Sequence, residues 1–267
     1  MQQPKRNDQC PCMSGLKFKK CCDFTGVWQN FSPQGLTYID ESYYLSELLE
    51  DPSFNNLYIS ERGKINKDIM FFKADFDMKS SASYGHLGEE IYMIMTPFSK
   101  VPIDESIHIA HELMHLVLHS EGHKALEFVD EATKKVSRIN KFLNDMIFDP
   151  LVNKRLILAG FDLAWYLKEA DKVQLGTSHV GEGELLLATL YVKRLYDYRN
   201  LNPNIQEDDI EFIRWLKKEH PQIVEKSLDM LNILEKYSLE QPDSSEAAFH
   251  ELLSYLDLKN KMILKAI

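Results

Sequence analysis

The sequence has no long apolar run and no excess of positive charge. None of its apolar stretches approaches the ~20 residues that a membrane-spanning helix needs. The first residues, Met-Gln-Gln-Pro-Lys-Arg-Asn-Asp, lead into no signal-peptide core, so we expect a cytoplasmic protein with no membrane partner. The 267 residues carry a formal net charge of -10, whereas phosphate binding needs a basic face. The composition therefore argues against nucleic acid as a partner.

Cysteine is missing from residue 23 onward. All four cysteines lie in the run Cys10-Pro-Cys12-Met-Ser-Gly-Leu-Lys-Phe-Lys-Lys-Cys21-Cys22. Disulfides are one interpretation, but a reducing compartment and such close spacing favour a zinc site with four thiolate ligands. The Ser14-Gly15 pair permits the turn that would bring the two cysteine pairs together. We therefore expect a structural zinc ion held by these four residues.

This segment resembles the SEC-C motif, known from the tail of the bacterial preprotein-translocase motor. The family pattern is roughly Arg-Asn-Asp-x-Cys-Pro-Cys-Gly-Ser-Gly-x-Lys-x-Lys-x-Cys-Cys/His, and the chain departs from it only at Met13, where glycine is usual. The resemblance implies a zinc knuckle over residues 1–25 that docks on a protein partner, in the family's case a chaperone or the ribosome. Lys17, Lys19 and Lys20 would give the knuckle a positive surface, or they could simply be solubilising charge.

The second candidate site lies in the run His108-Ile-Ala-His111-Glu112-Leu-Met-His115-Leu-Val-Leu-His119, which contains His-Glu-x-x-His. On a helix, His111 and His115 lie one turn apart on the same face, where two imidazoles can bind one metal ion. Glu112 lies beside that face and can take a proton from water, as in zinc metallopeptidases. The residues around the motif are apolar on nearly every side of the helix, so the helix should be buried. Burying two histidines and a glutamate costs free energy unless they have partners. The pattern therefore predicts a catalytic zinc helix.

A catalytic zinc site needs a third protein ligand. Downstream, Leu143-Asn144-Asp145-Met146-Ile147-Phe148-Asp149 has helical spacing and resembles the Asn-Glu-x-x-x-Asp segment of gluzincin (thermolysin-like) peptidases. The resemblance implies that Asp145 is the third ligand and that Asp149 orients a zinc-binding imidazole. Here aspartate replaces the family's glutamate, so the second helix would have to come closer.

Other ligands remain open at this point: Glu131, Asp130 and His119 are rivals for the third position. His119 is one turn beyond the motif, where it could instead be a neighbour of the site or a helix C-terminal residue favoured by the dipole. A metzincin site does not fit, because its glycine and third histidine would fall at Leu118 and Glu121.

The rest of the chain predicts an α+β, predominantly helical fold with a zincin-like domain over residues 36–267. A helix is expected over 38–49, ended by Asp51-Pro52-Ser53. Strands are expected at 56–60, 68–76 and 90–96, with a hairpin near Gly85 to Gly88, in a small sheet over ~55–97. Part of the 80–88 segment could line a substrate, since zincins place an edge strand beside the zinc helix. The zinc helices should span ~104–149 and a helical bundle ~151–267, with Pro150 and Gly160 bounding its first helix.

One loop in the bundle could complete a catalytic site. Gly176-Thr-Ser-His179-Val-Gly-Glu-Gly carries His179 into the start of a helix, and gluzincins bring a distant His or Tyr to stabilise the oxyanion. Less specific candidates for this task are Tyr84, Tyr92, Tyr166 and Tyr191.

Together these features predict a protein with two zinc ions, one structural and one catalytic, that hydrolyses peptide or protein substrates. Zinc would be held by His111, His115 and Asp145, with Glu112 as the proton shuttle. The alternative is an inactive zincin-like adaptor or sensor that binds a protein or ribosome partner through the knuckle. An open coordination position beside an edge strand would favour the enzyme.

Overall fold

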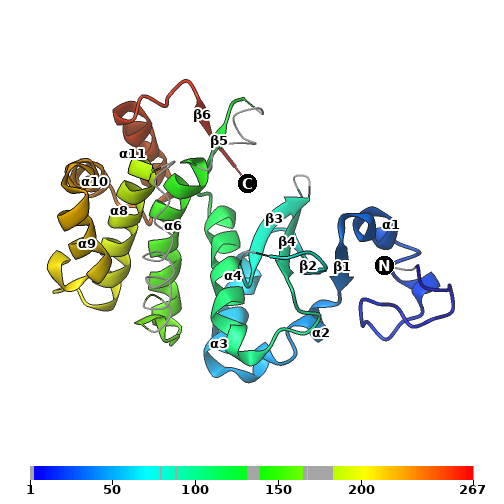
Figure 1. Cartoon of the computed structure of the whole chain (residues 1–267). Helices are drawn as coiled ribbons and strands as arrows, with labels where there is room; N and C mark the ends of the chain where they lie inside the picture. The colour runs from blue at the N-terminus through cyan, green and yellow to red at the C-terminus, as the bar shows by residue number, and fades with distance from the viewer. Residues whose placement is uncertain are drawn as a thin grey trace. The chain divides into compact units, whose positions relative to one another are not determined.

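The structure is a computed structural model, and it describes residues 3–78, 80–87, 90–130, 139–164, 167 and 183–266 (Figure 1). The chain divides into two compact units, Met1–Ser120 and Glu121–Ile267. Both units combine helices with a few short strands, and helix predominates, which confirms the α+β class. Within the described ranges, every helix is too short or too polar to cross a membrane.

A four-stranded mixed sheet forms the centre of the first unit. Its strands are β1 (Leu36–Ile39), β2 (Asp68–Ala74), β3 (Ser83–Leu87) and β4 (Ile91–Thr96). They lie in the order β1-β2-β4-β3, with β2 and β4 parallel and the other two pairs antiparallel. A hairpin was expected with its turn near Gly85 to Gly88; β3 and β4 do pair as antiparallel neighbours, but Gly85, His86 and Leu87 belong to β3 itself. Strand β3 forms one edge of the sheet.

The helices of the first unit are α1 (Val27–Phe31), α2 (Glu41–Tyr44), α3 (Pro52–Glu61) and α4 (Ser106–Ser120). Single 3-10 turns add η1 (Phe18–Lys20), η2 (Ser32–Gln34), η3 (Leu48–Glu50), η4 (Arg62–Lys64) and η5 (Ile103–Glu105). Helix α4 packs against α3 and against strands β3 and β4. The His-Glu-x-x-His sequence therefore lies on a helix that is laid against the edge of the sheet.

Two expectations about local structure in this unit are wrong. The segment 56–60, expected to be a strand, lies inside α3, because Asp51-Pro52-Ser53 begins a helix and does not end one. The Asp51 carboxylate accepts a hydrogen bond from the Ser53 backbone N–H at 2.9 Å, and proline occupies the first helical turn, where its missing N–H costs nothing.

The helix expected over 38–49 is also interrupted. Tyr38 belongs to β1, whose Thr37 and Ile39 favour an extended backbone, and Asp40 then starts a short helix by accepting from the Ser42 N–H at 3.1 Å. Only α2 and η3 are helical in this stretch.

The second unit is a helical bundle with one small ribbon. The ribbon pairs β5 (Ala125–Phe128) with β6 (Met262–Lys265) in antiparallel orientation, and the sequence patterns had not indicated it. The helices are α6 (Ile139–Leu158), α8 (Gly183–Leu201), α9 (Glu211–Glu219), α10 (Pro221–Leu234) and α11 (Pro242–Tyr255), with the 3-10 turn η6 (Glu207–Asp209) before α9. Helix α6 packs on α8, α8 on α10, and α10 on α9 and α11.

Pro150 lies inside α6 and does not end it, contrary to the expectation of a boundary there. Proline cannot donate a backbone hydrogen bond, so α6 lacks one internal hydrogen bond at this point. The Asn200 side chain of α8 donates to the Pro150 carbonyl at 2.8 Å. One turn later, Asn153 donates to the buried Asp197 carboxylate at 2.7 Å. These polar contacts fasten α6 to α8.

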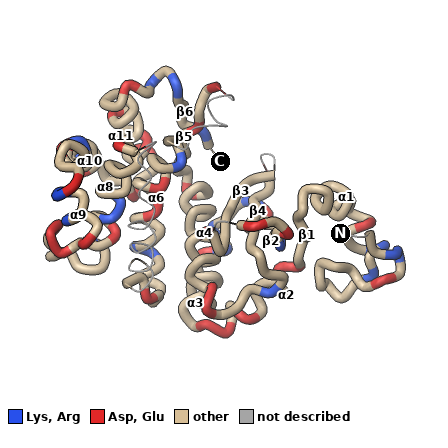
Figure 2. Tube along the Cα trace, in the orientation of Figure 1, with Lys and Arg blue, Asp and Glu red and all other residues tan. Residues whose placement is uncertain are grey.

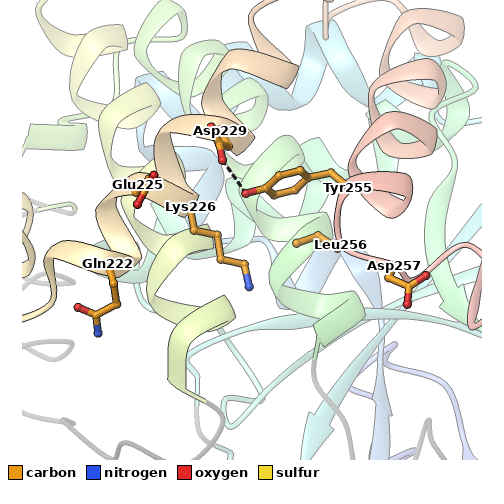
Figure 3. A pocket seen from close by; sticks show the side chains of 7 residues that line it. All are labelled: Gln222, Glu225, Lys226, Asp229, Tyr255, Leu256 and Asp257. Atoms are coloured by element: carbon orange, nitrogen blue, oxygen red, sulfur yellow. Dashed lines mark hydrogen bonds between the residues drawn. The ribbon is translucent and has the colours of Figure 1, made fainter.

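A shallow hollow of about 480 Å³ lies between α10 and the end of α11 (Figure 3). The Tyr255 hydroxyl donates to the Asp229 carboxylate at 2.9 Å across it, and Lys226 lies beside Glu225. The lining is mostly charged and solvent-facing, as expected for the outer face of a helical bundle.

Candidate metal centres

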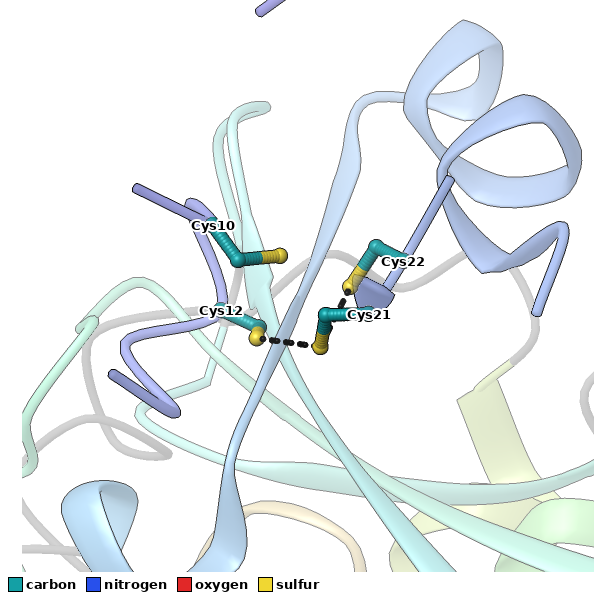
Figure 4. Close-up of side chains that lie close together, drawn as sticks. All are labelled: Cys10, Cys12, Cys21 and Cys22. Atoms are coloured by element: carbon teal, nitrogen blue, oxygen red, sulfur yellow. Dashed lines mark hydrogen bonds between the residues drawn. The ribbon is translucent and has the colours of Figure 1, made fainter. Parts of the chain in front are cut away.

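The four cysteines converge on one point in the first unit (Figure 4). Their sulfur atoms all lie within 4.8 Å of one another; Cys12 and Cys21 are 3.4 Å apart and Cys21 and Cys22 4.0 Å. Four sulfurs around a tetrahedral zinc, each about 2.3 Å from the ion, would lie about 3.8 Å apart. The geometry and the donor chemistry both fit zinc, so this cluster could hold the ion.

Local backbone bonds build this knuckle. The Cys10 N–H donates to the Leu16 carbonyl at 2.8 Å, and the Met13 N–H donates to the Cys10 carbonyl at 3.1 Å. The turn between them requires left-handed backbone at Met13, with φ of 66°, and at Gly15, with φ of 74°. Met13 is the position where the SEC-C pattern has glycine, so the structure gives a physical reason for that preference.

The knuckle also has a small apolar core that it shares with the sheet. Phe18 packs edge-on against Trp28, with ring centroids 5.7 Å apart, and Tyr38 of β1 packs against the same cluster. The Asp40 N–H at the end of β1 donates to the Cys12 carbonyl at 2.7 Å. The knuckle is therefore anchored to the first strand by packing and by a backbone hydrogen bond.

The thiols titrate very differently without a metal. Hydrogen bonding from Cys22 lowers the pKa of Cys12 to about 4, whereas burial raises the pKa of Cys21 to about 11. The pKa of Cys22 is also raised, first by its hydrogen bond to Cys12. The Cys12 thiolate is thus stabilised by neighbouring thiols, and a cation is needed to make Cys21 and Cys22 thiolates at neutral pH.

The second candidate centre is on α4. The Nε2 atoms of His111 and His115 are 3.1 Å apart, and their ring centroids are 4.8 Å apart. Two nitrogens about 2.0–2.1 Å from a tetrahedral zinc would lie about 3.3 Å apart. Both side chains are buried. The two imidazoles therefore present their nitrogens at the spacing that two ligands of one zinc ion would need.

Glu112 and strand β3 meet beside this histidine pair. The Tyr84 backbone N–H donates to Glu112 Oε2 at 3.1 Å, which holds the carboxylate against the edge strand. The Tyr84 ring stacks on His115, with centroids 5.0 Å apart and planes 18° apart. Its hydroxyl lies 3.2 Å from Nε2 of His119. The edge strand thus contacts the motif glutamate and two histidines of the helix.

These contacts bear on the alternative roles considered for two side chains. His119 directs Nε2 at the Tyr84 hydroxyl and also lies in the last turn of α4, so both sequence interpretations of this residue stay open. Tyr84, a candidate for oxyanion stabilisation, places its hydroxyl 3.2 Å from Nε2 of His119, and its role in catalysis stays a prediction. An edge strand beside this helix was expected from the zincin resemblance, whereas the individual contacts of Tyr84 were not, because β3 and α4 are joined by tertiary packing alone.

The predicted aspartates lie on α6 of the second unit. Asp145 pairs with Lys141 at 3.0 Å, and Asp149 pairs with Lys193 of α8 at 2.9 Å. Burial and then the charge of Asp149 raise the pKa of Asp145 to about 6. The two carboxylates lie one turn apart, as the Asn-Asp-x-x-x-Asp spacing predicts. The role of Asp145 as third ligand stays a prediction.

The other candidates named from the sequence stay predictions. Asp130 is exposed after β5, and Tyr191 donates to Glu207 at 2.8 Å. The Tyr92 ring lies under the Lys67 ammonium, 4.8 Å from it. His179, Glu131 and Tyr166 lie outside the described residues.

Comparison with known families matches residues 6–22 to the SEC-C motif. No curated protein matches the chain. No solved structure matches it either. The N-terminal segment thus contains a SEC-C motif, and its cysteine cluster could bind zinc.

Proposed function

We propose that the protein is a zinc-dependent peptidase whose second metal site lies on α4. The observation that carries the proposal is the convergence of His111 and His115, 3.1 Å apart at Nε2, next to a glutamate that strand β3 holds in place. A chance His-Glu-x-x-His on a solvated helix would have no reason to bury both imidazoles among apolar neighbours.

In this proposal His111 and His115 hold zinc, with Asp145 as the third ligand that the gluzincin resemblance assigns. Bound zinc lowers the pKa of a water molecule and polarises a peptide carbonyl. The Glu112 carboxylate accepts the proton of the attacking water and delivers it to the leaving amine. The N–H of Tyr84 supports this role, because its hydrogen bond at 3.1 Å holds the carboxylate in one orientation.

The test is Glu112→Gln in the full chain, with Glu61→Gln as a matched control at the end of α3, where the carboxylate pairs with Lys64 at 2.8 Å. Glutamine keeps size and hydrogen-bonding capacity but has no basic carboxylate, so zinc content should persist while peptide cleavage is lost. Cleavage is read by mass spectrometry on a mixed peptide library, with metal measured on the same samples. Cleavage that survives in Glu112→Gln would contradict the proposal.

A second candidate is an adaptor or sensor that binds a protein or ribosome partner through the knuckle. The SEC-C match and the basic residues that gather along the N-terminal coil favour it (Figure 2). Lys17 and Lys20 are exposed there, on a chain whose net charge is -10. A wild-type protein that holds zinc on α4 yet cleaves no library peptide would favour this adaptor.

A further inference from the structure

One residue of the edge strand contacts three residues of α4. Tyr84 donates its backbone N–H to Glu112, stacks its ring on His115 and places its hydroxyl against His119. We infer that Tyr84 is the positioning residue of the α4 metal site. This inference rests on the proposed function, since it concerns how the same site keeps its geometry.

The stacking contact acts on a ligand directly. An imidazole turns about its Cβ–Cγ bond unless something flat lies against it, because that torsion is broad. The Tyr84 ring, only 18° from parallel to His115 at 5.0 Å, limits this rotation and keeps Nε2 directed at Nε2 of His111. A ligand fixed in this way loses less freedom when the metal binds, and the affinity is correspondingly higher.

The other two contacts fasten strand β3 to helix α4 at two further positions. The N–H bond to Glu112 sets the carboxylate one turn before His115, and the hydroxyl contact to His119 fixes the next turn after it. Tyr84 thus spans two turns of α4 from a single position on β3. The residue paired with Tyr84 on the neighbouring strand β4 is Ile94, whose apolar side chain cannot form a hydrogen bond with the Tyr84 hydroxyl.

Three variants separate the contacts. Tyr84→Phe keeps the ring and the backbone N–H and loses only the hydroxyl, whereas Tyr84→Leu loses the ring as well. Tyr92→Leu is the matched control, since Tyr92 is a buried tyrosine of the adjacent strand β4 whose ring lies against the Lys67 ammonium. It should reproduce any general loss of packing in the sheet.

Zinc per chain would be measured over a series of buffered free zinc concentrations, with the knuckle ion as internal reference. We expect Tyr84→Leu to weaken the α4 site by roughly 10- to 100-fold, the usual effect of losing a group that orients a ligand. Tyr84→Phe should weaken it by only about threefold, a smaller part of the same effect. With cobalt as the probe metal, the visible spectrum of the α4 site should change in Tyr84→Leu and keep its wild-type form in Tyr92→Leu.

The outcomes separate this inference from the proposed function. Equal affinities in Tyr84→Leu and Tyr92→Leu, with unchanged cobalt spectra, would overturn the positioning role even if the wild type cleaves peptides. A wild type that binds the second zinc ion but cleaves no peptide would refute the peptidase function. The comparison of zinc affinities would still decide whether Tyr84 positions the ligand. A wild type with no second zinc at any concentration overturns both.

Discussion

Replacing Met13 with glycine should tighten zinc binding by the knuckle. Met13 has φ of 66°, and a residue with a side chain pays about 1–2 kcal/mol to adopt this left-handed backbone. Glycine adopts it freely, although its extra freedom in the unfolded chain costs about 0.5–1 kcal/mol. The Met13 side chain is 48% exposed, so its removal leaves no cavity. Zinc binding by the Met13→Gly knuckle should therefore be stronger by about 0.5–1 kcal/mol, the difference between the strain relieved and the entropy lost.

Leu16→Gly is the matched control for this substitution. Leu16 is 52% exposed, lies three residues further along the same turn and is absent from the positive-φ positions of the described chain. Glycine relieves no backbone strain at this position, and its extra freedom in the unfolded chain should weaken zinc binding by about 0.5–1 kcal/mol. The two variants should therefore differ by about 1–2 kcal/mol, which is roughly 5- to 30-fold in zinc Kd.

The assay is competition between the full-length chain and a chromophoric chelator, because zinc binding and folding of such a knuckle are the same free energy. The knuckle ion is identified as the one that Cys21→Ser/Cys22→Ser removes. Zinc binding that weakens equally in Met13→Gly and Leu16→Gly would refute the reasoning, since it would mean that no backbone strain resides at Met13.

Two further predictions concern metal content. Cys21→Ser/Cys22→Ser should lower the zinc content from about two ions per chain to about one, as the two ligand sets imply, and simultaneous loss of both ions would contradict independent sites. Asp145→Ala should release the α4 metal and Asp149→Ala should weaken it by roughly 10- to 100-fold, while Glu131→Ala should leave it in place. Full zinc content in Asp145→Ala would move the third ligand to Glu131 or Asp130.

Sequence patterns predicted the elements whose periodicity is strong. The apolar run around His111 gave α4, and the β-branched and aromatic stretches gave β2 and β4. The predictions were wrong where a short polar segment is compatible with either the start or the end of a helix. Asp51-Pro52-Ser53 was interpreted as a helix stop, yet the same three residues are a good helix start, and the Asp51 side chain also accepts from Ser106 of α4 at 2.7 Å.

The candidate sites also differ in how far the sequence alone could predict them. The four cysteines and the pair His111 and His115 are close in sequence, so local geometry alone brings their ligand atoms together. The contacts of Tyr84 with α4 join residues about thirty positions apart, and no local pattern specifies them. Asp145 is predicted only by resemblance, because a third ligand from another helix depends on tertiary packing.

The cysteine cluster is part of the fold of the first unit, because it shares an apolar core with the sheet. Tyr38 packs on the cysteine cluster from one face of β1, and Cys12 accepts the backbone N–H of Asp40 directly after that strand. Loss of zinc would expose the sulfurs and release both contacts, so β1 would lose part of its support on the side away from β2. Strand β3, which holds Tyr84, lies at the opposite edge of the same sheet. Two strands separate the edges, so the knuckle metal should affect the stability of the first unit much more than the geometry at His111 and His115.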